Sequence, residues 1–388
     1  VSIHAPIVEK ARGLGIPVLG EVELAHHLSP WPLISVTGTN GKSTTCSLVQ
    51  EFLAPASFLA GNIGLPLVSE IEAHLGDSNI AWVVSEISSF QLETVHQFRP
   101  KVAVLTNITP DHLDRHKTMD EYARAKARLF HQQTAEDWAI CNEDDPLTLQ
   151  VCQQLRQGQH QPWFEGFPAP QNVAPQVFSY STQHRVERGC YFDSSSRWIY
   201  FVSNDAGTDT TASKPILEWN YPNLPGPHNL SNAVAAILVG HLLGVSSDKM
   251  HQVLKNYGRL HHRLELVENF GGVQFVDDSK ATNVSSVSAA LETFGSERPT
   301  VLIAGGRDKG LDLDELARSI VQFAHGLVYI GEAGPSIAEK ALGCGLNPQH
   351  CLSASDMAQA VQLGFQMLQP QGGVVLLSPA CTSFDMFS

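Results

Sequence analysis

The stretch "SVTGTNGKSTT", residues 35–45, constrains the fold most, because it lies between a short apolar run and a helical pattern. A lysine that follows glycines and precedes hydroxyls is typical of a loop that holds a triphosphate. The loop is a shortened variant, since Val36 stands where the fuller P-loop pattern has a further glycine. Apolar residues recur at helical spacing over 48–53, so a helix should begin just after Lys42, with its unpaired N–H groups facing the loop. The alternative is a glycine-serine turn with a surface lysine.

Composition limits the class of protein. The chain has 388 residues, which favours two or three domains of about 100–200 residues each. A formal charge of −14 argues against nucleic acid or an anionic membrane as partner, because both need a broad basic surface. Seven scattered cysteines without C-x-x-C spacing indicate neither a disulfide framework nor a zinc site. This use of cysteine fits a reducing cytoplasm best. No apolar run approaches the ~18 residues of a membrane span.

Strands alternate with helices along most of the chain, which predicts α/β architecture with parallel sheets and crossover helices. The stretch 155–215 breaks this rhythm, and "GCYFDSSSRWIYFVS" within it predicts two strands joined by a serine turn. We interpret it as an antiparallel insertion, and we place a domain boundary near 257–263. The predicted strands are Leu33–Val36, Ala81–Val84, Val102–Leu105, Val273–Val276, Val301–Ala304, Leu327–Ile330 and Val374–Leu377.

A carboxylate follows the second of these strands. In "AWVVSEISSFQLE", Glu86 comes at the carboxyl end of the run, where open α/β sheets bind ligands. Beside a phosphate loop it is a candidate magnesium ligand together with Ser43. The alternative is a solvated loop carboxylate.

A lysine on an apolar helix face is the second candidate. Thr118 and Glu121 fit a capping box, and Tyr122, Lys126 and the apolar pair 129–130 then share one face. Either Lys126 snorkels with its ammonium at the rim, or burial lowers the pKa of the amine so that it takes up carbon dioxide as a carbamate.

The motifs taken together resemble the Mur ligase family. They occur in the family's order over nearly the whole chain: "TGTNGKST", "GNIGLP", "SEISSFQLE", "NITPDHLDRH", "YARAKARLF", "GPHNLSNAVAA", "HHRLELV", "DDSKATN", "GGRDKG" and "LLSPACTSFDMF". Three of them, "SSFQLE", "DSKATN" and "SPACTSFDMF", are specific to the members that add D-glutamate. The resemblance implies transfer of the γ-phosphate of ATP to a substrate carboxylate, followed by attack of an amine on the acyl phosphate.

The resemblance also implies a role for each matching residue. The catalytic set is Lys42, His112, Lys126 and Lys280. Two Mg²⁺ ions would be held by Ser43 with Glu86 and by His112 with carbamylated Lys126. ATP contacts would come from Gly38, Thr39, Asn40, Gly41, Lys42, Ser43, Thr44, Asn229, Asn232, Arg263 and Asp278; by spacing alone Asn229 and Asn232 could equally be helix caps. Substrate contacts would come from Asn62, Ser88, Thr282, Lys309, Ser383 and Phe384, where Lys309 could otherwise be a solvated turn lysine.

The implied substrates are UDP-N-acetylmuramoyl-L-alanine and D-glutamate, and we expect a monomer. The implied organisation is a remnant of a UDP-binding domain at 1–28, reading as a final helix and strand, a central ATP-binding P-loop-type domain at 29–259 and a Rossmann-like amino-acid-binding domain at 260–388. The family's N-terminal domain is largely missing and its closing helix is absent, so we expect ATP binding but poor retention of the nucleotide sugar. Two alternatives stay open: another Mur ligase or a folylpolyglutamate synthase-like ligase, and a P-loop regulatory ATPase.

Overall fold

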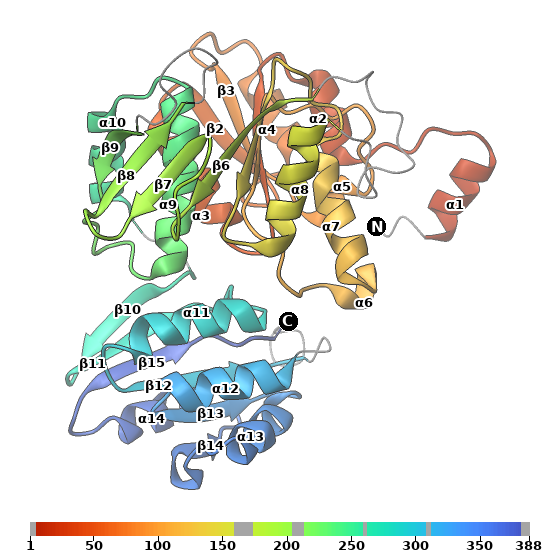
Figure 1. The fold of residues 1–388 in the computed structure, drawn as a ribbon. Helices are drawn as coiled ribbons and strands as arrows, with labels where there is room; N and C mark the ends of the chain where they lie inside the picture. The colour runs from red at the N-terminus through yellow and green to blue at the C-terminus, as the bar shows by residue number, and fades with distance from the viewer. Residues whose placement is uncertain (1–4, 159–173, 204–212, 259–261, 308–311, 382–388) are drawn as a thin grey trace. The chain divides into compact units, whose positions relative to one another are not determined.

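The chain forms two compact α/β units (Figure 1). The computed structural model describes residues 5–158, 174–203, 213–258, 262–307 and 312–381. The first unit comprises Val1–Thr109, His116–Pro222 and Asn229–Tyr257. The second comprises Pro110–Arg115, Asn223–His228 and Gly258–Ser388. Among the described residues, no helix combines the length and apolar character that crossing a bilayer requires.

The first unit is built on a nine-stranded sheet in the order β2-β3-β1-β4-β5-β6-β7-β8-β9. Neighbouring strands are parallel from β2 to β7, and β7, β8 and β9 pair antiparallel. The strands are β1 (Leu33–Thr37), β2 (Ser57–Gly61), β3 (Trp82–Glu86), β4 (Val102–Leu105), β5 (Trp138–Asn142), β6 (Gln176–Ser181), β7 (Gly189–Asp193), β8 (Trp198–Val202) and β9 (Ser213–Glu218). Strand β1 lies between β3 and β4, so the turns that follow these three strands meet at one edge of the sheet.

Helices cover both faces of this sheet. One face carries an apolar cluster in which Leu33, Val83 and Leu105 pack with α2, α4, α5, α7 and α8. The alternate strand residues, such as Ile34 and Val104, are also fully buried, as expected for parallel strands covered on both sides. The helices are α1 (Pro6–Gly13), α2 (Glu21–Leu28), α3 (Lys42–Leu53), α4 (Leu67–His74), α5 (Ser89–Leu92), α6 (Leu113–His116), α7 (Met119–Ala127), α8 (Pro146–Gln157), α9 (Pro227–Leu242) and α10 (Ser247–Asn256), with a 3₁₀ turn at Arg128–Phe130.

The second unit is a three-layer sandwich around a six-stranded sheet in the order β10-β11-β15-β12-β13-β14. All neighbours are parallel except the edge pair β10 and β11. Along β12, Leu302 and Ala304 pack with α11, α12 and α13, whereas Val301 and Ile303 pack on the face that α14 covers. The elements are β10 (Glu265–Phe270), β11 (Val273–Asp277), α11 (Val284–Gly295), β12 (Thr300–Gly305), α12 (Leu313–Phe323), β13 (Gly326–Ile330), α13 (Gly334–Gly343), a 3₁₀ turn at Pro348–His350, β14 (Cys351–Ser353), α14 (Met357–Met367) and β15 (Gly373–Leu377).

The predicted α/β class and all seven predicted strands are confirmed. The antiparallel interpretation of 155–215 holds for β7 to β9 but is wrong for β6, which pairs parallel with β5 because α8 carries the chain back across the sheet. The strand expected within 1–28 is also wrong, since residues 5–28 contain α1 and α2 and no strand. The apolar run there includes Pro17, which has no N–H group to give to a neighbouring strand. The domain division at 28/29 and 259/260 stays a prediction.

Candidate nucleotide and metal site

Two glycines of the loop between β1 and α3 have backbones that other residues could not readily adopt. Gly38 has φ +150° and Gly41 has φ +83°. A Cβ atom at Gly38 would overlap the hydroxyl of Thr106, and one at Gly41 would overlap the side-chain oxygen of Asn232. The loop therefore passes close to both neighbouring segments, and the N-terminus of α3 opens onto it as predicted.

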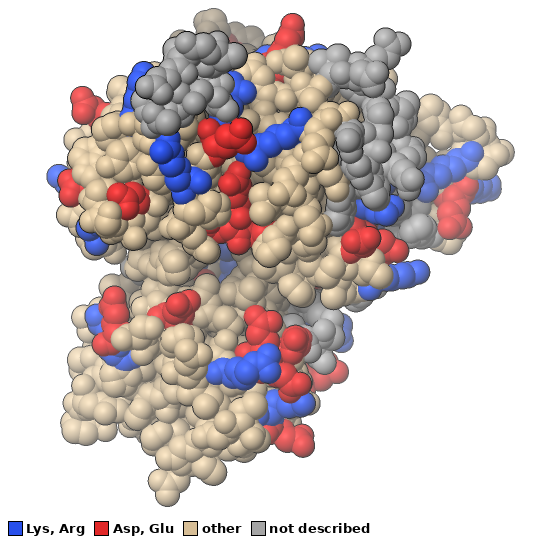
Figure 2. Space-filling view, viewed as in Figure 1, with Lys and Arg blue, Asp and Glu red and all other residues tan. Residues whose placement is uncertain are grey.

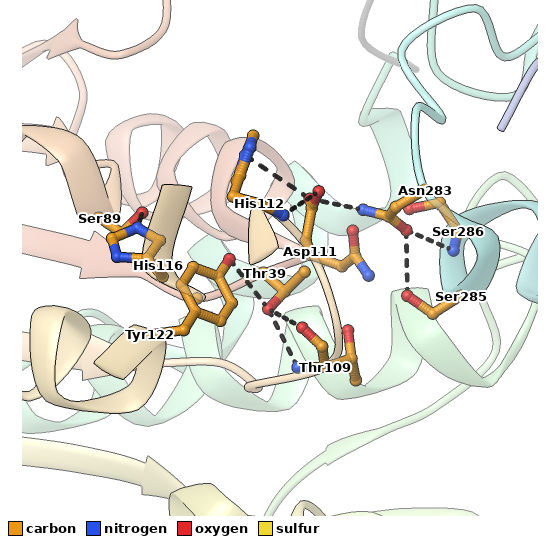
Figure 3. A network of polar contacts seen from close by, with 12 residues as sticks. Thr39, Ser89, Thr109, Asp111, His112, His116, Tyr122, Asn283, Ser285 and Ser286 are labelled. Carbon is orange, nitrogen blue, oxygen red and sulfur yellow. Dashed lines mark hydrogen bonds and ion pairs between the residues drawn. The ribbon is translucent and has the colours of Figure 1, made fainter. Parts of the chain in front are cut away.

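Polar side chains hold the loop against the segment after β4. The N–H of Asn40 donates to Oδ1 of Asn107 at 2.8 Å, and the Thr106 hydroxyl donates to the Asn40 carbonyl at 2.6 Å. The Thr39 hydroxyl donates to the carbonyl of Thr109 at 3.1 Å, and the hydroxyls of Thr39 and Tyr122 are hydrogen-bonded at 3.3 Å (Figure 3). The loop is thus fixed by long-range contacts as well as by its own turn.

Lys42 bends back over the loop. Its Nζ donates to the carbonyls of Gly38 at 3.0 Å and Thr39 at 2.8 Å. The ammonium therefore lies against the loop backbone. Thr44, in the first turn of α3, is half-buried.

Ser43, Glu86 and Asn62 form a polar cluster at the carboxyl ends of β1, β2 and β3, in which Ser43 and Glu86 are buried and Asn62 is exposed. The Ser43 hydroxyl donates to Oε2 of Glu86 at 2.6 Å, and Nδ2 of Asn62 donates to Oε1 at 2.7 Å. Glu86 is only 3% exposed, so its interpretation as a solvated loop carboxylate is wrong. A hydroxyl and a carboxylate are hard oxygen ligands, and the two residues that we predicted to share a magnesium ion are in direct contact, so this cluster fits Mg²⁺.

Lys126 is buried beside the same loop. It is 1% exposed, its Nζ donates to the Gly38 carbonyl at 2.7 Å, and it lies 4.4 Å from the centre of the Tyr122 ring. The interpretation of Lys126 as a snorkelling lysine is therefore wrong. The ammonium groups of Lys126 and Lys42 both donate to the Gly38 carbonyl, which brings two cations to one point of the loop.

Three other predicted residues of the first unit have clear positions. Asn229 and Asn232 lie inside α9, which begins at Pro227, so neither is the N-cap residue of that helix. Asn232 is buried and faces Gly41. Ser88 caps α5, because its hydroxyl accepts from the N–H of Gln91 while Gln91 accepts from the N–H of Ser88.

In the second unit, Asp278 follows β11 and is buried. It accepts from the Ser378 hydroxyl at 2.9 Å, and burial raises the pKa of its carboxyl group to about 7. Arg263 lies close enough to interact with both Asp278 and His228; burial, with the charge of Arg263, lowers the pKa of His228 to about 4. Lys280 is exposed and Thr282 is half-buried.

His112 lies in the second unit by its contacts, whereas Lys126 lies in the first. The pairing of these two residues at one metal ion therefore stays a prediction. Lys309, Ser383 and Phe384 lie outside the described residues. Sequence reasoning did not assign a role to Asn107, Tyr122 or Asp111; the only signal was the spacing of Tyr122 one helical turn before Lys126.

A shortened P-loop with a buried serine–carboxylate pair, at the switch point of a parallel sheet, defines an α/β nucleotide-binding protein of the P-loop class. Residues 36–240 match the Mur ligase middle domain, and residues 262–381 match the Mur ligase glutamate ligase domain. The chain therefore belongs to the Mur ligase family.

Relatives match over the whole chain. It is 40% identical over 394 residues to UDP-N-acetylmuramoylalanine–D-glutamate ligase of Pelotomaculum thermopropionicum, covering 100% of this chain and 79% of that protein. It is 36% identical over 391 residues to the ligase of the same name from Caldanaerobacter subterraneus, with the same coverage. Folylpolyglutamate synthase of Mycobacterium tuberculosis, solved with ADP and AMPPCP, shares the fold with a TM-score of 0.65 and 16% identity, covering 96% of each chain.

Proposed function

We propose that this chain is an ATP-dependent ligase that adds D-glutamate to UDP-N-acetylmuramoyl-L-alanine in peptidoglycan synthesis. The observation that carries this proposal is the 36–40% identity to ligases of that name over the entire chain. The motifs "SSFQLE" and "DSKATN" support the choice of D-glutamate within the family.

The geometry of the loop accounts for the first half of the reaction. The N-terminus of α3 and the ammonium of Lys42 bind the phosphates of ATP. Ser43 and Glu86 would hold Mg²⁺, which screens the charge of the γ-phosphate as a carboxylate approaches it. The L-alanine carboxylate attacks the γ-phosphorus and ADP leaves. The amine of D-glutamate then attacks the acyl carbon, loses a proton, and expels phosphate.

We also propose that Lys126 is carbamylated and, with His112, would hold a second Mg²⁺. The two ammonium nitrogens lie 2.7 and 3.0 Å from one carbonyl oxygen, so they are at most 5.7 Å apart (2.7 + 3.0). At that separation two unit charges repel by about 3 kcal/mol at an effective dielectric constant of about 20. The ammonium first loses one proton to give the neutral amine. Addition of carbon dioxide to Nζ then forms an N–C bond and releases a second proton, so the cation is replaced with an anion and the repulsion becomes attraction. Labelling with ¹³C-bicarbonate tests this step, because a carbamate carbon signal should be present in the native chain and absent in Lys126→Arg.

The remaining contacts follow the family pattern. We propose that Asn229 and Asn232 face the adenine, and that Arg263, Asp278 and Lys280 contact the ribose and the phosphates. Thr282, Lys309, Ser383 and Phe384 would bind D-glutamate. Asn62 and Ser88 would contact the muramoyl-alanine arm, although the bond from Asn62 to Glu86 supports a role in orienting that carboxylate.

We propose that the enzyme is a cytoplasmic monomer with the domain division given above. Its proposed partners are small-molecule substrates. All seven cysteines carry free thiols, which suits a reducing compartment. On the face shown in Figure 2, basic side chains are interspersed with acidic ones and form no broad basic area, which favours small substrates over nucleic acid.

A panel of amino acids, assayed for phosphate release from ATP, tests the function. Release should require both UDP-N-acetylmuramoyl-L-alanine and D-glutamate. A requirement for another amino acid would indicate a different Mur ligase, and a requirement for a folate would indicate a folylpolyglutamate synthase-like enzyme. ATP hydrolysis independent of both substrates would indicate a regulatory ATPase.

A further inference from the structure

Asp111 lies at the centre of a set of contacts that the proposed reaction leaves without a role (Figure 3). Its Oδ1 accepts from the backbone N–H of His112 at 2.9 Å, and its Oδ2 accepts from Nδ2 of Asn283 at 3.1 Å. Nε2 of His112 lies 3.7 Å from the same Oδ2. The Asp111 side chain is 11% exposed, so these bonds form largely away from solvent.

The backbone of His112 is held in an unfavourable conformation. Its φ of +54° is in the left-handed region, which residues other than glycine adopt infrequently. Such a conformation persists only where the surroundings impose it, and it is most often found at functional positions. The bond from the His112 N–H to Asp111 is one contact that imposes it here.

Asn283 has a second function at its other end. It is the N-cap residue of α11, where its Oδ1 accepts from the N–H of Ser286 at 2.9 Å and from the hydroxyl of Ser285 at 3.0 Å. It directly follows Thr282, a proposed contact of D-glutamate. A shift of the backbone at Thr282 therefore moves the amide group that donates to Asp111.

We propose that Asp111 is a positioning residue that couples the D-glutamate pocket to metal binding at His112. The coupling runs from Thr282 through Asn283 and Asp111 to the backbone and ring of His112, all within the second unit. Because coupling of two binding sites is reciprocal, D-glutamate tightens the metal ion at His112 and the metal ion tightens D-glutamate. This inference depends on the proposed function.

An exchange of the two side chains tests the link. Asp111→Asn replaces one of the two accepting oxygens with an NH₂ group, which can only donate. The new side chain therefore cannot accept from both the His112 N–H and the Asn283 amide, and one of the two bonds is lost in either orientation of the new amide group. In Asn283→Asp, two carboxylates face each other, while the N-cap oxygen is kept because Asp caps helices as well as Asn does. The double variant restores both bonds, since the amide now at position 111 donates to the carboxylate now at position 283 and still accepts from the His112 N–H.

Binding of Mn²⁺ to the ADP-loaded enzyme, followed by electron paramagnetic resonance with and without D-glutamate, measures the coupling without turnover. In the native chain, D-glutamate should tighten the weaker Mn²⁺ site by about 5-fold or more. Each single variant should lose this effect and the double variant should regain it. Ser285→Ala, which leaves the Asp111 bond in place, and Asp120→Asn, which removes an exposed charge from α7, should both retain it.

Three results would overturn the inference: a native chain without the D-glutamate effect, single variants that keep it, or a double variant that does not regain it. Circular dichroism of each variant separates loss of coupling from loss of folding, and the double variant keeps the test decisive if one single variant is unstable. If phosphate release still depends on D-glutamate while the coupling is absent, only this inference fails. If D-glutamate does not support phosphate release, the proposed function itself fails.

Discussion

Substitution of Gly41 by alanine separates two reasons for a glycine in the phosphate loop. An alanine at φ +83° costs about 1 kcal/mol for the left-handed backbone. Its Cβ would also overlap Oδ1 of Asn232 and lie 3.0 Å from Cγ of that residue, on a buried side chain with little room to move. Overpacking of this kind costs about 1–3 kcal/mol, so Gly41→Ala should lower the free energy of unfolding by about 2–4 kcal/mol in total.

A double-mutant cycle with Asn232→Ala isolates the overlap. In the Asn232→Ala background the overlapping atoms are gone, so Gly41→Ala should cost only the backbone term of about 1 kcal/mol. Tryptophan fluorescence during urea unfolding is a selective assay, because all six tryptophans fall within the residue ranges of the first unit. If Gly41→Ala costs the same in both backgrounds, the close approach of α9 to the loop is not what requires the glycine.

Three further substitutions test other contacts. Glu23 is 1% exposed and accepts hydrogen bonds from three backbone N–H groups. Glu23→Ala should therefore lower the free energy of unfolding, measured in urea, by about 3–5 kcal/mol. The control Glu9→Ala, on the surface of α1, should change this free energy little. Asp278 keeps its proton in the folded chain up to pH about 7, whereas the unfolded chain releases it near pH 3.8, so the stability that this group contributes is complete below pH 3.8 and is lost as the pH rises to about 7. In Asp278→Asn, the free energy of unfolding measured by circular dichroism should therefore fall less steeply with pH over that window, by up to about 1.4 kcal/mol per pH unit. An unchanged slope would contradict the assignment of the raised pKa to Asp278. Glu86→Gln should raise the Mg²⁺ concentration needed for ADP binding by about 10-fold or more, measured by calorimetry against Glu51→Gln on α3, and an unchanged requirement would exclude Glu86 as a ligand.

The pairing of Ser43 with Glu86 could be predicted because it follows from two local rules. A serine after the loop lysine lies in the first turn of α3, and a carboxylate at the end of a parallel strand emerges at the same edge of the sheet. The register Val36 to Glu86 between β1 and β3 brings the two together. Neither rule needs knowledge of how distant helices pack.

The contacts of Lys126 and Asp111 could not be predicted in the same way. Helical spacing predicts that Lys126 lies on the apolar face of α7. It does not predict which loop that face contacts, because this depends on how the whole helix packs. The bond from Lys126 to Gly38 joins residues 88 apart, and that from Asp111 to Asn283 joins residues 172 apart. The strand expected within residues 1–28 was implied by the family resemblance and was wrong, since residues 5–28 contain α1 and α2 and no strand.

The two cations beside the phosphate loop come from different parts of the chain. Lys42 belongs to the turn that contains Gly38 and Gly41, and it contacts the Gly38 carbonyl from four residues away. The second cation, Lys126, comes from α7 and donates to the Gly38 carbonyl, and Tyr122 on the same helix face is bonded to Thr39 of the loop. Loss of the Tyr122 hydroxyl should therefore leave the turn intact while loosening the position of Lys126. In the function proposed above, the turn itself would contribute Lys42 to phosphate binding, whereas Lys126 would reach the site only through the packing of α7 against the loop.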